Sequence, residues 1–74
     1  MYPNMIRTRP QVDPNRNYNI KEVCDLLNIH RDTLRKYTNT EAIVCIRITS
    51  REVYYTGEEI IHFWEWMQQR KGNL

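Results

Sequence analysis

The sequence lacks several features on which secreted proteins, membrane proteins and most enzymes depend. Its two cysteines, Cys24 and Cys45, are too few and too far apart for a disulfide framework or a zinc module. No apolar run approaches the roughly 18 residues of a membrane span, and the N-terminus has no signal-peptide core. We therefore expect a complete, intracellular, cytoplasmic chain that does not bind membranes, with both cysteines reduced and packed in the core.

The sequence also gives little support to catalysis. A chain of 74 residues forms one small domain that buries only about 60% of its unfolded surface, and most enzyme architectures are larger. The two glycines lie in no phosphate-binding loop or nucleophile elbow. His62 would need a metal ligand from another element. We predict no catalytic residue, no metal, no cofactor and no small-molecule substrate.

Proline and positive charge are distributed unevenly along the chain. All three prolines lie in residues 1–18, a stretch that cannot sustain a helix and offers little to a core. The net charge of the whole chain is +2, and residues 1–18 and 31–56 each carry +2. We predict that residues 1–18 form an extended or mobile arm and that residues 19–74 form the folded domain.

Two short helices are predicted after the arm. Asn19 is a good N-cap, and Glu22 three residues later completes a capping box. Apolar residues then follow helical spacing as far as Leu27, and Asn28 suits a tight turn. A second helix begins near Arg31, only three residues after the first helix. The apolar stripes are Ile20, Val23, Cys24 and Leu27 in the first helix and Thr33, Leu34 and Tyr37 in the second, and this arrangement is a helix-turn-helix.

A hairpin and a third helix follow. Residues 42–56 are rich in β-branched and aromatic side chains and are interrupted by the polar residues 49–52, which predicts a two-stranded β-hairpin, here called the wing. Thr56 and Glu59 form a second capping box, and Ile60, Phe63, Trp64 and Met67 form the stripe of the last helix. The predicted fold is α+β and mainly helical: a winged helix-turn-helix.

Residues 18–37 resemble the winged helix-turn-helix of the MerR-like and excisionase-like families. The resemblance extends through the wing to about residue 68. The family pattern places a glutamate, a small residue, a leucine pair, an apolar residue after the turn and Thr-Leu in the second helix, and this chain has Glu22, Cys24, Leu26, Leu27, Ile29, Thr33 and Leu34 at those positions. The resemblance implies binding of double-stranded DNA, by an excisionase-like architectural factor of DNA recombination or by a small transcriptional regulator. MerR-like regulators normally continue into a dimerisation helix and an effector domain, so a complete chain ending at Leu74 favours the excisionase-like role, in the nucleoid.

Arginine lies where such a domain meets DNA. Arg31 and Arg35 are one turn apart on the exposed side of the second helix, whose N-terminal half fits the major groove. The wing and the arm can reach an adjacent minor groove or phosphate. The competing interpretation is that these arginines are solvated surface residues. The candidate DNA-binding residues are Arg7, Arg9, His30, Arg31, Arg35, Lys36, Thr38, Arg47 and Arg51.

Trp66 falls outside the apolar stripe of the last helix. Either Tyr2, Met5 or Ile6 from the arm covers it, or it belongs to an interface with a second copy or with a partner such as a recombinase. The alternative function is therefore a protein–protein interaction module that has lost DNA binding and docks through its C-terminal helix.

Overall fold

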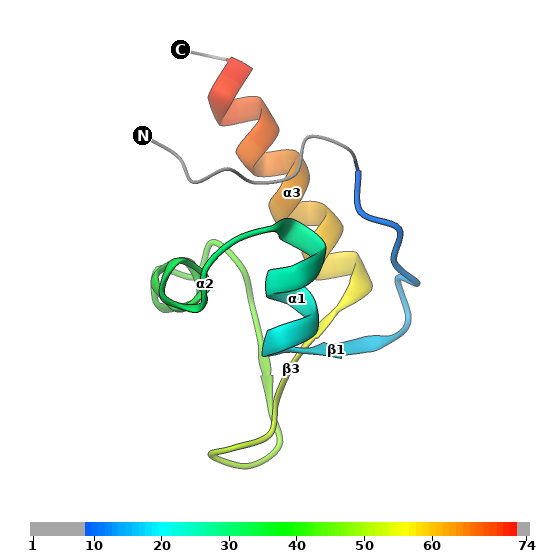
Figure 1. Cartoon of the computed structure of the whole chain (residues 1–74), viewed down its shortest axis with the longest axis vertical. Helices are drawn as coiled ribbons and strands as arrows, with labels where there is room; N and C mark the ends of the chain where they lie inside the picture. The colour runs from blue at the N-terminus through cyan, green and yellow to red at the C-terminus, as the bar shows by residue number, and fades with distance from the viewer. Residues whose placement is uncertain (1–8, 73–74) are drawn as a thin grey trace.

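The computed structural model describes residues 9–72, which form three helices and a small antiparallel sheet (Figure 1). Helix α2 lies to one side of α1 and α3, and the hairpin extends away from the helices at the end opposite the C-terminus of α3 (Figure 1). No helix in this part of the chain is long and apolar enough to cross a membrane. The elements are β1 (Asn17–Asn19), α1 (Ile20–Leu27), α2 (Arg31–Asn39), β2 (Ile46–Arg47), β3 (Val53–Thr56) and α3 (Gly57–Gly72).

Helix α1 begins and ends as the sequence predicts. The Asn19 side chain accepts a hydrogen bond from the Glu22 N–H, and the Glu22 carboxylate accepts one from the Asn19 N–H, so the capping box is confirmed. Asn28 ends the helix in the left-handed conformation with φ of 55°, which asparagine tolerates better than most residues. The turn then places Ile29 in the core. The predicted helix-turn-helix is confirmed.

The core lies where the three helices meet the sheet. Its fully buried side chains each contribute about 1.5–3 kcal/mol of transfer free energy relative to exposure, which matters in so small a domain. Cys24 is buried, and this burial raises the pKa of its thiol, whereas Cys45 is only half-buried, against our expectation for it. The largest fully buried side chains are Val23, Leu27, Leu34, Ile43, Ile60 and Phe63.

The sheet contains a strand that the sequence analysis misses. The wing is present as the antiparallel pair β2–β3, but β1 pairs with the other edge of β3 and gives the order β1-β3-β2. Tyr18 lies opposite Tyr55, and both are buried. Pro10 is buried as well, and Val12 packs against the core. The prediction that the stretch before residue 19 offers little to the core is therefore wrong for residues 9–18, while the division of the chain into arm and domain stays a prediction.

The segment before β1 also caps α3. The Gly57 N–H donates to the Arg16 carbonyl at 2.9 Å, and the Glu58 N–H donates to the Pro14 carbonyl at 3.2 Å. These carbonyls satisfy N–H groups that have no partner inside the helix. The approach is so close that a Cβ on Gly57 would lie 2.0 Å from the carbonyl oxygen of Asp13. Only glycine fits this contact.

The second capping box is half right. Thr56 Oγ1 accepts from the Glu59 N–H at 3.2 Å, as predicted for an N-cap. The Glu59 carboxylate, however, accepts from the Val44 N–H at 3.0 Å, so it fastens the segment before β2 to the start of α3. The Glu59 carboxylate does not complete the capping box because of the tertiary structure: Thr56 is also the last residue of β3, where it pairs with Asn17.

Candidate nucleic-acid interface

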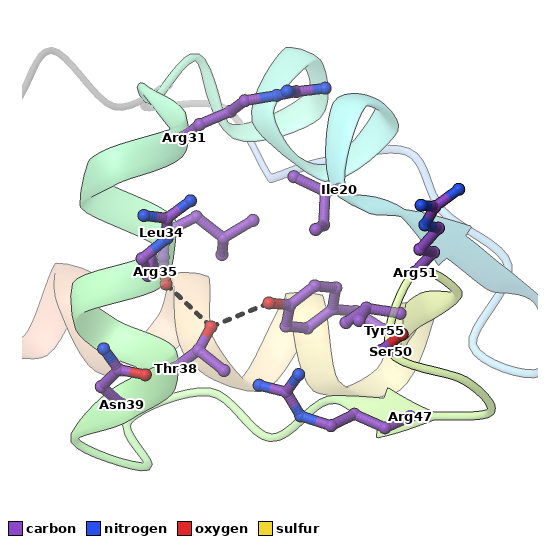
Figure 2. Close-up of a pocket in the computed structure, with 11 residues that line it drawn as sticks. Ile20, Arg31, Leu34, Arg35, Thr38, Asn39, Arg47, Ser50, Arg51 and Tyr55 are labelled. Carbon is purple, nitrogen blue, oxygen red and sulfur yellow. Dashed lines mark hydrogen bonds between the residues drawn. The ribbon is translucent and has the colours of Figure 1, made fainter.

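A hollow of about 410 Å³ lies between α2 and the wing, and it gathers most of the predicted DNA-binding residues (Figure 2). We call it the arginine hollow. Helix α2 forms one wall, the wing forms the other, and the start of α1 contributes Ile20 (Figure 2). Its lining residues are Ile20, Arg31, Leu34, Arg35, Thr38, Asn39, Arg47, Ser50, Arg51, Val53 and Tyr55.

Four arginines stand around this hollow, one on each side in the view of Figure 2. Arg31 and Arg35 come from successive turns of α2, about 6 Å apart along the helix axis. Arg47 comes from β2 and Arg51 from the loop between β2 and β3. All four are exposed. Residues that are up to 20 positions apart in the sequence thus form one positively charged surface.

No carboxylate neutralises this surface among the side chains that the structure describes. Arg16 forms an ion pair with Glu22 at 3.5 Å, and the 3.6 Å contact of His30 Nδ1 with the Asp32 carboxylate is an ion pair only if His30 is protonated; neither contact involves an arginine of the hollow. The four guanidinium groups are therefore available to an external anion. Each presents a planar fork of N–H donors that fits a phosphate or a guanine edge.

A pair of hydroxyl groups lies between the helix and the wing. Thr38 Oγ1 lies 2.8 Å from the Leu34 carbonyl and 2.8 Å from the Tyr55 hydroxyl (Figure 2). Burial raises the pKa of Tyr55, so its hydroxyl stays protonated at neutral pH. Thr38 is predicted to contact DNA, and the structure shows that its hydroxyl already bonds within the protein.

The tip of the wing is held by its own hydrogen bonds. Thr49 Oγ1 accepts from the Arg51 N–H at 3.3 Å and from the Glu52 N–H at 3.0 Å. The Ile48 N–H donates to the Glu52 carbonyl at 2.9 Å, which closes the turn. This local network presents Ser50 and Arg51 to the hollow.

The other candidates lie outside the hollow. His30 caps α2, because its Nδ1 accepts from the Asp32 N–H at 3.2 Å. Lys36 is exposed on α2, and Arg9 is exposed ahead of β1, but neither lines the hollow. Arg7 lies outside the described residues. Their contacts with DNA stay predictions.

Six residues that line the hollow are absent from the predicted DNA-binding residues: Ile20, Leu34, Asn39, Ser50, Val53 and Tyr55. Asn39 follows Arg35 by four residues, so helical spacing could have placed it beside the arginines. The sequence gives less indication that Tyr55 lines the hollow, because the strand pattern does not show which face of the wing turns toward α2. Its position depends on packing between elements that are distant in sequence.

Trp66 belongs to an aromatic group that joins α3 to α2 through Phe63 and Tyr37. Its ring lies 6.3 Å from that of Tyr37 and 6.1 Å from that of Phe63, and 37% of the residue is exposed. The arm residues that were expected to cover it lie outside the described residues. Among the described residues, no group of three or more metal-binding side chains comes together.

A family model described as a helix-turn-helix domain, of the excisionase-like family, matches residues 18–70. The match covers most of β1, both helices of the motif, the wing and most of α3. Comparison with curated proteins and with solved structures gives no match.

Proposed function

This chain belongs to the helix-turn-helix domain family, whose membership implies DNA binding, and on that premise we propose that it binds double-stranded DNA through α2 and the wing. Helix α2 would enter the major groove, and the wing would lie along the neighbouring backbone and minor groove. The family is typically non-enzymatic. The proposal needs no cofactor.

The arginine hollow carries this proposal. The strand of DNA that separates a major groove from its neighbouring minor groove must pass between a helix in the first and a wing in the second. In this protein, that space is lined by Arg31, Arg35, Arg47 and Arg51. Four unneutralised guanidinium groups beside a phosphate backbone provide the salt-dependent part of the affinity. Arg31, near the helix start, is also placed to reach base edges.

The finer role that we propose is that of an excisionase-like architectural factor, which organises a recombination site for a partner enzyme. The resemblance to excisionase-like proteins supports this role, and the alternative is a small transcriptional regulator, because the family match implies DNA binding for both. A single small domain makes few phosphate contacts, so binding to tandem sites or pairing with a second copy would raise its occupancy. We propose the nucleoid as its place of action and a recombinase as its partner.

The first test is direct binding to a labelled random-sequence duplex, followed by fluorescence anisotropy at about 50 and about 200 mM salt. We expect micromolar binding that weakens with salt and is greatly reduced when Arg31 and Arg35 are both replaced by alanine. The matched control is Arg16→Gln, which removes one positive charge from an arginine engaged with Glu22 and Tyr18 instead of the hollow. Wild-type protein that binds no duplex at the lower salt would contradict the proposal.

A second test separates the two roles. Once a preferred site has been selected, gel mobility of the site placed at different positions along a fragment reports bending. Position-dependent mobility supports the architectural role, and uniform mobility favours the regulator. Trp66→Ala should leave DNA affinity unchanged, because Trp66 packs against Tyr37 and Phe63 instead of lining the hollow.

A further inference from the structure

The hydroxyl groups of Tyr55 and Thr38 join the wing to α2, and we propose that these two residues position the helix and the wing so that both sets of arginines meet the same DNA. The inference rests on the proposed function. It assigns a role to Tyr55 and changes that of Thr38 from a DNA contact to a positioning residue.

The direction of the hydrogen bonds follows from the number of protons. Thr38 Oγ1 has one hydrogen, and its 2.8 Å approach to the Leu34 carbonyl uses that hydrogen, because a carbonyl only accepts. The Tyr55 hydroxyl at 2.8 Å must therefore donate to Thr38 Oγ1. The result is a chain that runs from Tyr55 in β3 through Thr38 to the backbone of α2 at Leu34. We call it the hydroxyl relay.

Each end of the relay lies next to an arginine of the hollow. On α2, Thr38 follows Arg35 by three residues, which places the two on one face of the helix. In the sheet, Val53 and Tyr55 are two residues apart in β3, so their side chains lie on the same face, and Arg47 pairs with Val53. The hollow is lined by all of these residues. A shift in the relay would therefore move the helix arginines relative to the wing arginines.

The surroundings of Tyr55 make the relay rigid. Tyr55 is only 2% exposed, and it lies on the central strand of the sheet between β1 and β2. A hydroxyl at such a position must find a partner, because leaving it unsatisfied costs free energy. The partner available is on α2. The relay is the side-chain hydrogen-bond link that the structure shows between α2 and the sheet.

The test compares variants that remove or restore single hydroxyl groups. Tyr55→Phe and Thr38→Val each break the relay, and Thr38→Ser keeps the hydroxyl. Tyr54→Phe is the matched control, because it removes a hydroxyl from the neighbouring residue of β3, whose side chain points to the opposite face and does not line the hollow. Each variant is titrated with a duplex over a range of salt, at a temperature at which thermal melting shows it to be folded.

We expect the relay to affect how many phosphates are contacted at once. Four arginine contacts give a slope of log affinity against log salt of about −3.6, and two give about −1.8. Tyr55→Phe and Thr38→Val should bind more weakly at about 50 mM salt, with slopes that flatten toward the lower value. Their double variant should be no worse than either one, since both break the same relay. Thr38→Ser and Tyr54→Phe should match the wild type.

Two results would overturn the inference while leaving the proposed function intact. In the first, Tyr55→Phe has the affinity and slope of Tyr54→Phe. In the second, it loses affinity but keeps the wild-type slope, so that the number of phosphates contacted is unchanged. Failure of the wild type to bind any duplex is a different outcome, because it overturns the proposed function and the inference with it.

Discussion

Replacement of Gly57 by alanine tests the contact between the N-terminal segment and the start of α3. The added Cβ would lie 2.0 Å from the Asp13 carbonyl oxygen and 2.7 Å from the Asp13 carbonyl carbon, both of which are backbone atoms. The Asp13 backbone must retreat by about 1.4 Å, the difference between 2.0 Å and the 3.4 Å at which ordinary contact begins. Such a movement breaks the hydrogen bonds that the N–H groups of Gly57 and Glu58 donate to this segment.

The expected loss can be estimated from those two hydrogen bonds. Each contributes about 1 kcal/mol net, and alanine returns up to about 1 kcal/mol through its higher helix propensity. The free energy of unfolding should therefore fall by about 1–2 kcal/mol, which for a domain of this size lowers the melting temperature by about 4–16 °C. This is a large part of the few kcal/mol that stabilise a small domain.

Thermal unfolding followed by circular dichroism is a sufficient assay. Gly72→Ala is the matched control, because it makes the same substitution at the other glycine of the chain, in the last turn of α3. We expect no loss of stability there. A Gly57→Ala variant that melts at or above the wild-type temperature would refute the reasoning and show that the segment before β1 adapts to the Cβ without cost.

Further predictions concern charge, thiol reactivity and pH. Between about 50 and 200 mM salt, wild-type affinity for duplex DNA should fall about 150-fold, as measured by anisotropy, if all four arginines of the hollow contact phosphates. Over the same range, the residual affinity of an Arg31→Gln/Arg35→Gln variant should fall about 12-fold. Equal salt dependence in the two proteins would contradict the assigned contacts. Cys45, which is half-buried, should react with a thiol reagent before Cys24, whose pKa is raised by burial, and equal rates in the native protein would show that the burial is not protective. Burial also raises the pKa of Tyr55 above its ordinary value of 10.0, and that of Cys24 above 9.0, so the folded state holds these protons more tightly than the unfolded state. The free energy of unfolding should accordingly decline as the pH rises above about 9 and continue to decline through the folded pKa values. Denaturant titrations that show a constant free energy of unfolding between about pH 8 and 11 would contradict the raised pKa values.

Features that depend on neighbouring residues were predictable from the sequence. The capping box of Asn19 and Glu22, the left-handed turn at Asn28 and the cap at His30 all involve groups within three residues of one another. The periodicity of apolar residues then indicates which faces are buried, as Leu34 confirms. Local spacing also placed Arg31 and Arg35 together on α2.

Features that depend on distant partners were not predictable in the same way. Residues 17–19 are too short and too polar to indicate a strand, and β1 exists because the edge of β3 is free to pair with it. Glu59 was predicted to bond to Thr56, but the Val44 N–H lies within its reach after folding. In both cases the partner is a backbone group that lies far away in the sequence: β3 for β1, and the Val44 N–H for the Glu59 carboxylate.

The sequence by itself determined the helix-turn-helix, the position of the wing and the family, since these follow from caps, turns and periodicities that extend over a few residues. Only the tertiary structure decided that Arg47 and Arg51 join Arg31 and Arg35 around one hollow, and that Thr38 and Tyr55 bond to each other between them. The physical reason is that the angle between α2 and the wing is set by packing and hydrogen bonding across more than ten residues of chain. No local pattern encodes that angle.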